Sequence, residues 1–187
     1  YEPDAGAGLY RFRSIYRLSD WDGDVIAPLA QPGVEVNEGD YLLEVNGRPV
    51  ATDESVYAAF QNTAGRQITI LVNDRPDADG AREVTVMPVG NEQPLAYEAW
   101  VEDNRRKVSE ASDGRLAYIH MPDTAFDGVK RFSRDFYAQS DKSGVILDGR
   151  YNSGGFIPDY VVDRLSRPFL GYWSRREGMD FRTPGAA

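Results

Sequence analysis

Cysteine is absent from the 187 residues, and histidine occurs once, as His120. Disulfides, thiolate catalysis and cysteine-ligated zinc are thereby excluded, and several histidines cannot combine into a metal site. The sequence has no apolar run of the roughly 18 residues that a transmembrane helix needs, and its first residues lack the basic-then-apolar pattern of an export signal. We therefore expect no metal site and no membrane-spanning segment.

Positive charge is also scarce. The chain has 21 lysines and arginines against 30 aspartates and glutamates, a formal net charge of −9. Such an acidic chain repels phosphate backbones, so we expect no nucleic-acid partner. Its hydrophobic fraction of 41% is that of an ordinary globular protein, and its length fits one large domain or two small ones.

The hydrophobic pattern changes near Pro88 and Pro94. Short alternating or apolar runs before this point predict a small β-rich domain over residues 1–91. Longer helical patterns alternate with short strands after it, which predicts an α/β unit over residues 92–187. In the first part we expect strands at 9–16, 25–29, 41–45, 67–72 and 82–87, with a helix at 53–61. In the second we expect helices at 95–112, 125–140 and 160–165, a strand at 116–121 and a buried parallel strand at 144–148.

Residues 32–50, PGVEVNEGDYLLEVNGRPV, are the most informative segment of the first part. Gly39 and Asp40 make the turn into a strand, and Asn46 and Gly47 form a strong hairpin signal. A generic hairpin would carry the same Asn-Gly pair. The spacing of glycines and apolar residues nevertheless resembles bacterial-type PDZ domains, and the helix pattern that follows fits them too. The resemblance implies a small PDZ-like β-barrel.

A PDZ domain binds an extended peptide by adding it as a strand to an exposed sheet edge beside a helix. The resemblance places that edge on residues 9–15 and implies peptide contacts from Gly8, Leu9, Tyr10 and Arg11. A loop at residues 6–9 would capture the peptide's carboxylate. This loop has only half of the usual glycine–hydrophobic–glycine pattern. A PDZ-like domain with a purely structural role is therefore the alternative.

The second part contains a glycine-rich turn within residues 144–156, GVILDGRYNSGGF. Gly154 and Gly155 follow an apolar strand and precede a helix expected near Pro158. Paired glycines let backbone N–H groups face a ligand without side-chain obstruction, as an oxyanion hole requires. A helix start would add unpartnered N–H groups and the positive end of a dipole. The spacing of these residues alone favours a tight turn with no chemical role over an oxyanion hole.

Longer motifs change that balance. The pattern D-x-R-x-N-x-G-G after an apolar strand resembles the carboxy-terminal-processing and tricorn-type serine peptidases, in which a PDZ domain precedes it. Residues 97–108 (YEAWVEDNRRKV) and 114–123 (GRLAYIHMPD) are similar to the tricorn protease core. Arg175 and Arg176, followed by Gly178, also resemble that family. The resemblance to the tricorn protease family covers nearly the whole chain in order.

The resemblance implies that residues 92–187 are the N-terminal part of a crotonase-like α/β domain. Gly155 would be an oxyanion-hole donor, with Gly154 its close alternative. In the family the catalytic histidine precedes the PDZ domain and the nucleophilic serine follows the glycine motif. The resemblance thus implies that this chain holds neither and is a fragment of a serine peptidase.

The parent protein would hydrolyse oligopeptides in the cytoplasm without a cofactor. It would form a homo-oligomer, and its remaining catalytic subdomains would belong to the same polypeptide. A non-catalytic peptide-binding adaptor that uses the PDZ edge is the alternative function.

Four further polar residues are not expected to take part in catalysis. A lone histidine at a strand end is usually structural, so we do not expect His120 to be a general base. Ser153 adjoins the paired glycines but has no base at a predictable distance, so we do not expect it to be a nucleophile. Asp123 and Asp148 are expected to cap or brace loops.

Overall fold

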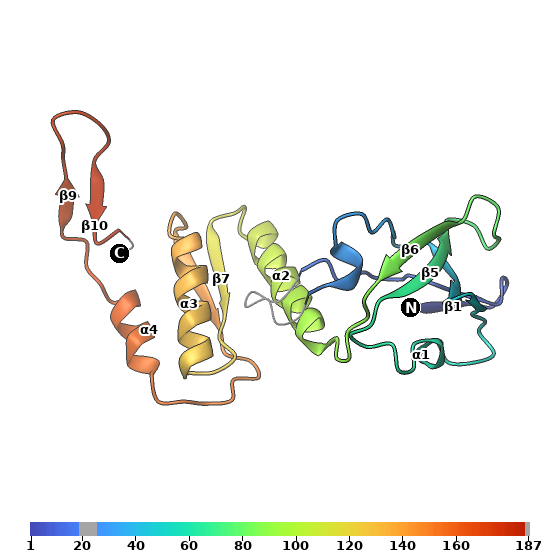
Figure 1. The fold of residues 1–187 in the computed structure, drawn as a ribbon. Coiled ribbons are helices and arrows are strands. Elements are labelled where there is room, and N and C mark those ends of the chain that lie inside the picture. Colours follow the sequence, from blue (N-terminus) through green and yellow to red (C-terminus); the bar gives the residue numbers. More distant parts are fainter. Residues whose placement is uncertain (19–25, 186–187) are drawn as a thin grey trace. The chain divides into compact units, whose positions relative to one another are not determined.

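A computed structural model describes residues 1–18 and 26–185, and the chain divides into two compact units, Tyr1–Trp100 and Val101–Ala187 (Figure 1). Helix α2 (Gln93–Ala111) belongs to both units, because the division by contacts falls inside it. The domain boundary expected at residues 91 and 92 lies at the start of this helix and stays a prediction.

The first unit is built on an antiparallel six-stranded sheet in the order β1-β2-β3-β5-β6, with β4 paired to β3. Within residues 1–18 and 26–100 its hydrogen bonds run from β1 to β6 and do not join these two strands, so the expected barrel is open there. With β1 and β2 only three residues long, few ladder bonds are available for closure. The strands are β1 (Glu2–Asp4), β2 (Leu9–Arg11), β3 (Tyr41–Val45), β4 (Arg48–Pro49), β5 (Ile68–Asn73) and β6 (Arg82–Val86).

Local sequence explains this sheet. Asn46 and Gly47 both have positive φ, 50° and 72°, which is the geometry that an Asn-Gly hairpin turn between β3 and β4 requires. Strands β3, β5 and β6 confirm the expected ones. Their buried apolar side chains form one core together with residues of the preceding loops. That core contains Phe12, Ile15, Val36, Leu42, Val45, Val50, Val56, Ile68, Ile70, Val72, Val84 and Val86.

Three expectations in this unit need correction. The predicted strand at 9–16 is confined to β2, because the N–H and carbonyl of Phe12 bond the loop residues Asp40 and Gly39 instead of a strand. The predicted helix at 53–61 shortens to α1 (Val56–Ala59). Pro28–Ala30 forms a 3-10 helix, η1, where the end of a strand was expected, since Pro28 lacks the N–H that a ladder uses. Val25, at the start of that expected strand, lies outside the described residues.

The second unit contains a short parallel sheet. Strands β7 (Leu116–His120) and β8 (Gly144–Asp148) pair in parallel from Leu116↔Gly144 to His120↔Asp148, and α3 (Phe126–Ala138) connects them. This is the right element order for a strand–helix–strand unit. Phe132 of α3 is fully buried and stacks on Phe136, with ring centroids 5.2 Å apart. The remaining elements are α4 (Pro158–Leu165), β9 (Gly171–Trp173) and β10 (Phe181–Thr183), the last two an antiparallel pair.

Strand β8 is parallel, as expected, but it is not buried. Ile146 and Leu147 are each 41% exposed, because within the described residues only β7 pairs with β8 and the other edge is open. No helix among the described residues has the length and apolar character to cross a membrane.

Candidate functional site

The glycine turn after β8 is tied to the loop that follows β7. The N–H of Ser153 donates to the Pro122 carbonyl at 2.9 Å. The N–H of Thr124 donates to the Gly154 carbonyl at 2.8 Å, and the Thr124 carbonyl accepts from the N–H of Ile157 at 2.8 Å. These bonds fix the turn on both sides of Gly155 without using its own N–H.

Glycine is required at position 155 for two separate reasons. Its φ of +142° lies in the region that L-residues rarely adopt. A Cβ built there would lie 2.3 Å from both the carbonyl carbon and the oxygen of Thr124, far inside contact distance. Gly154 differs: its φ is +90°, but a Cβ there would meet open space. Close backbone packing against Thr124 therefore concerns Gly155 alone.

The two glycines also differ in their N–H groups. The Gly154 N–H donates to Oδ1 of Asn152 at 2.7 Å, while Nδ2 of Asn152 donates to the Met121 carbonyl at 3.1 Å. Within residues 1–18 and 26–185, no acceptor is bonded to the N–H of Gly155, and this residue is exposed. Gly155 is thus the glycine whose donor is available to a ligand.

The expected reason for that availability was wrong. Helix α4 begins at Pro158 with Ile157 as its N-cap, so Gly155 lies two positions before the cap. Its N–H is not one of the orphan donors of the first helical turn. It is unpartnered because the Asn152 side chain and the Thr124 backbone hold the turn through its neighbours. Asn152 is the asparagine of the D-x-R-x-N-x-G-G pattern, but no role was expected for it, and Thr124 was not singled out from the sequence.

Asp148, the last residue of β8 before the turn, forms a polar network. Its carboxylate accepts from the Tyr118 hydroxyl at 2.6 Å and from Nη2 of Arg150 at 2.6 Å. The hydrogen bonds from Arg150 hold the pKa of Asp148 well below its usual range. Burial, and then the bond to Asp148, raise the pKa of Tyr118 to about 12, so this phenol stays protonated as a donor. The network confirms that Asp148 braces the loop.

His120 lies in the same network and is buried. Its ring is 1% exposed, and Nε2 lies 2.8 Å from the carbonyl oxygen of Arg150. Ser153 donates its hydroxyl to the Pro122 carbonyl at 3.3 Å. Asp123 caps the start of α3, because its Oδ1 accepts from the N–H groups of Ala125 and Gly128 at 2.8 and 2.7 Å.

In the first unit, the expected peptide edge is occupied. Strand β2, which contains Leu9, Tyr10 and Arg11, pairs antiparallel with β1 on one side and with β3 on the other. The expectation that these three residues present an exposed edge is therefore wrong. A chain segment that was not predicted to be a strand, Glu2–Asp4, fills the position beside them.

The loop that leads to Gly8 does capture a carboxylate, but the carboxylate belongs to the chain itself. Oδ1 of Asp4 accepts from the N–H groups of Gly6 and Ala7 at 3.0 and 3.2 Å, and the Gly8 N–H donates to the Asp4 carbonyl at 2.8 Å. Oδ2 of Asp4 accepts from the Tyr41 hydroxyl at 2.8 Å. The bonds from Tyr41 and the loop lower the pKa of Asp4. An aspartate two residues before a glycine is a turn signal that could have suggested this.

In the part of the chain that the structure describes, no group of three or more histidines, aspartates and glutamates is placed to hold an ion.

Comparisons with known proteins identify relatives of this chain. The family of the tricorn protease PDZ domain matches residues 1–91. The chain is 35% identical over 173 residues to tricorn protease homolog 1 of Streptomyces coelicolor, covering 92% of this chain and 16% of that protein. It is 31% identical over 152 residues to the tricorn protease of Thermoplasma volcanium, covering 81% of this chain and 15% of that protein.

A solved structure is similar along nearly the whole chain. The crystal structure of the tricorn protease superposes with a TM-score of 0.84 at 27% sequence identity, over 98% of this chain and 18% of the solved one. This chain therefore spans only about a sixth of the curated relatives named above.

Proposed function

Because this chain belongs to the tricorn protease family, we propose that it is the PDZ-like domain and part of the catalytic domain of a serine peptidase that hydrolyses oligopeptides. Its chemical contribution is the backbone N–H of Gly155, which donates to the oxyanion of the tetrahedral intermediate. The observation that carries the proposal is the exposed N–H of Gly155, to which no acceptor of residues 1–18 or 26–185 is bonded, on a turn held by the bonds of the Gly154 N–H, the Gly154 carbonyl and the Ile157 N–H.

An oxyanion donor has to be positioned before charge develops, since its value lies in avoiding reorganisation during the reaction. The bonds from Thr124 and Asn152 supply that rigidity on either side of the glycine. Gly154 is the weaker candidate, because its N–H would first have to leave the Asn152 side chain. We assign Gly155 as the donor and Gly154 as a residue that shapes the turn.

The nucleophilic serine and the catalytic histidine are proposed to come from other segments of the parent polypeptide. The uncovered apolar edge of β8, with Ile146 and Leu147 exposed, supports a larger crotonase-like α/β domain in which a further strand or helix covers it. We further propose, on family resemblance alone, that the parent is a cytoplasmic homo-oligomer that needs no cofactor.

Two observations weigh against a peptide-binding adaptor as the main function. Strand β1 already fills the edge beside β2, and the Asp4 carboxylate already holds the N–H groups of the loop. A peptide terminus would have to displace both. A structural PDZ-like domain agrees better with this arrangement than one that captures free carboxyl termini at Gly8–Arg11.

The test is steady-state kinetics of the complete parent enzyme with Gly155→Val and Gly154→Ala. Loss of one oxyanion donor costs roughly 2.7–4 kcal/mol, so kcat of Gly155→Val should fall about 10²–10³-fold with KM changed much less. Gly154→Ala, where a Cβ meets open space, should lose far less activity.

A folded Gly155→Val enzyme with near-normal kcat would remove Gly155 from the active site. Since a Cβ at 155 meets the Thr124 backbone, Asn152→Ala provides a second route that leaves both glycines in place. It should lower kcat by loosening the turn. An unchanged kcat in that variant would contradict the requirement for a rigid donor.

A further inference from the structure

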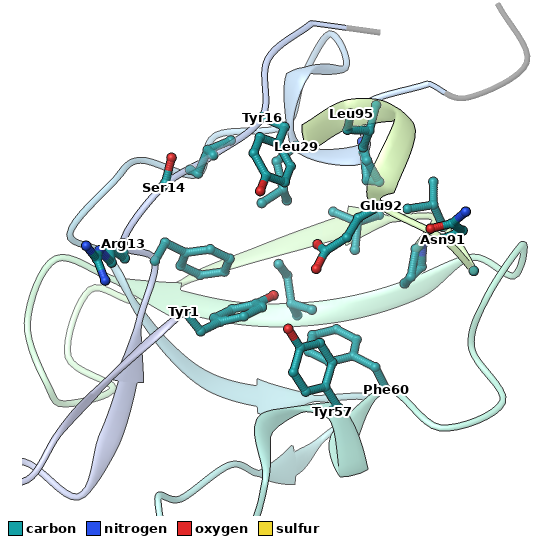
Figure 2. A pocket seen from close by; sticks show the side chains of 18 residues that line it. Tyr1, Arg13, Ser14, Tyr16, Leu29, Tyr57, Phe60, Asn91, Glu92 and Leu95 are labelled. Carbon is teal, nitrogen blue, oxygen red and sulfur yellow. The ribbon is translucent and has the colours of Figure 1, made fainter. Parts of the chain in front are cut away.

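A cavity of about 600 Å³ opens in the first unit, away from the glycine turn. Its lining comes from residues 12–16 after β2, from η1, from helix α1 and its C-cap, and from the segment that leads from β6 into α2, together with Tyr1 and one residue each of β5 and β6 (Figure 2). The volume is in the range of small-ligand sites. Such a cavity needs few polar groups to select a ligand, so the charge and direction of its polar side chains decide what it takes.

Aromatic and aliphatic side chains form most of the wall. The Tyr1 ring packs on Phe12 and Phe60, with centroid distances of 5.0 and 6.2 Å. Tyr57 lies beside them and is 65% exposed. Aromatic ring faces attract cations, and the attraction is larger where the site is partly desolvated. The aliphatic part of the lining is Ile15, Leu29, Ile70, Val86, Val89 and Leu95.

One carboxylate faces this space. Figure 2 shows the Glu92 carboxylate directed into the cavity, with the hydroxyls of Tyr1 and Tyr57 pointing toward the same region. Burial, and then the charge of Glu92, raise the pKa of the Tyr1 phenol. No basic side chain of residues 1–18 or 26–185 forms an ion pair with Glu92.

The single basic residue among the described lining residues is Arg13. In Figure 2 its guanidinium lies at the far end of the cavity from Glu92 and is turned away from the centre. Of the side chains that line the cavity, Glu92 is therefore the charged one directed at the space beside Tyr1 and Tyr57, in a chain whose net charge is already −9. A ligand with a cationic group near Glu92 is favoured, and its apolar part would lie along the aliphatic side chains of the cavity.

We propose that this cavity binds the protonated side chain of a lysine carried by a peptide. Glu92 is the counter-ion, the rings of Tyr1 and Tyr57 contact the ammonium group, and the methylenes lie along Leu29 and Leu95. This site is separate from the β2 edge that β1 covers. It does not depend on the peptidase assignment, because occupancy is measured without turnover.

The alternative role of Glu92 is structural. It directly precedes α2, and a negative charge at a helix N-terminus stabilises the helix. That role would make Glu92 matter for stability but not for the choice of ligand. The experiment therefore compares two ligands that differ only in charge.

The full 187-residue chain is titrated with a capped alanine–lysine–alanine peptide and with its norleucine analogue, and amide NMR shifts are followed. The lysine peptide should give saturable shifts at the cavity residues, at Gly90, Asn91 and Leu95 among others, and bind at least about tenfold more tightly than the norleucine peptide. Glu92→Gln should abolish that preference. Glu83→Gln, an exposed glutamate on β6, is the matched control and should preserve it.

Equal affinity for the two peptides, an unchanged preference in Glu92→Gln, or saturable shifts confined to other residues would each overturn the proposal. So would the absence of saturable binding by the lysine peptide. Tyr57→Ala tests the aromatic contact at an exposed position where folding is not at stake. It should weaken the lysine peptide more than the norleucine peptide, and an equal loss for both would contradict the contact.

Discussion

Replacing Gly155 with alanine should destabilise the second unit more than the same change at Gly154. Both positions have positive φ, +142° and +90°, and strain of this kind costs an L-residue roughly 1–2 kcal/mol. Only at 155 does the new Cβ fall 2.3 Å from the Thr124 carbonyl, where something must move. The bonds of Thr124 to Gly154 and Ile157 are then strained or lost, at about 1 kcal/mol each.

The expected loss is therefore about 1–2 kcal/mol for Gly154→Ala and about 2–4 kcal/mol for Gly155→Ala. In a chain of this size the difference corresponds to a melting temperature lower by about 2–8 °C for Gly155→Ala. Thermal unfolding measures the total effect. Amide hydrogen exchange at Thr124 and Ile157 reports the local one, and both amides should lose protection in Gly155→Ala only. Equal stability of the two variants with both amides still protected would refute the close packing of Gly155 on Thr124.

Three other measurements test the Asp148 network, the division of the chain into domains, and the expected lack of peptidase activity in the isolated chain. The pKa of Asp148 is lower in the folded chain than the value of about 3.9 expected in the unfolded chain, so its ionised form stabilises the fold and this stabilisation is lost as pH falls. The difference in unfolding free energy between the native chain and Asp148→Asn should therefore shrink from about pH 5 to about pH 2. A difference that stays constant with pH would contradict the assignment. Residues 1–91 should fold alone and give dispersed amide NMR peaks, and collapsed peaks would contradict this. A fragment of residues 1–100 should be more stable than residues 1–91 by about 1.5–3 kcal/mol, because it also contains Leu95, which is 2% exposed. The isolated 187-residue chain should not cleave fluorogenic peptides, and cleavage that Ser153→Ala abolished would make that serine the nucleophile after all.

Much of the fold could be predicted because its signals are local. The Asn46-Gly47 turn, the alternation in Ile68–Asn73 and the spacing of Phe132 and Phe136 each depend on neighbouring residues. Strand β1 could not be predicted in this way, because three residues carry too little pattern and its pairing with β2 depends on a turn. The exposure of β8 depends on what lies beside it, which an apolar run does not reveal.

The sequence predicted which residues make up the candidate site but not how they are arranged. The paired glycines and the motif around them pointed to the turn, and the likeness to a known family gave it a role. The distinction between Gly154 and Gly155 depends on Thr124, which lies on a different loop and carries no motif of its own. The position of α4 relative to Gly155 depends on Pro158, whose fixed φ suits the first helical position.

The most direct test of the central claim is a crystal structure of the complete enzyme with a peptide aldehyde or boronate bound covalently as a mimic of the tetrahedral intermediate. If Gly155 is the oxyanion donor, its nitrogen should lie about 2.7–3.1 Å from the oxyanion oxygen of the adduct. The Gly154 N–H should remain bonded to Asn152. An adduct oxygen that is bonded to other donors, with the Gly155 nitrogen beyond hydrogen-bond distance, would contradict the account.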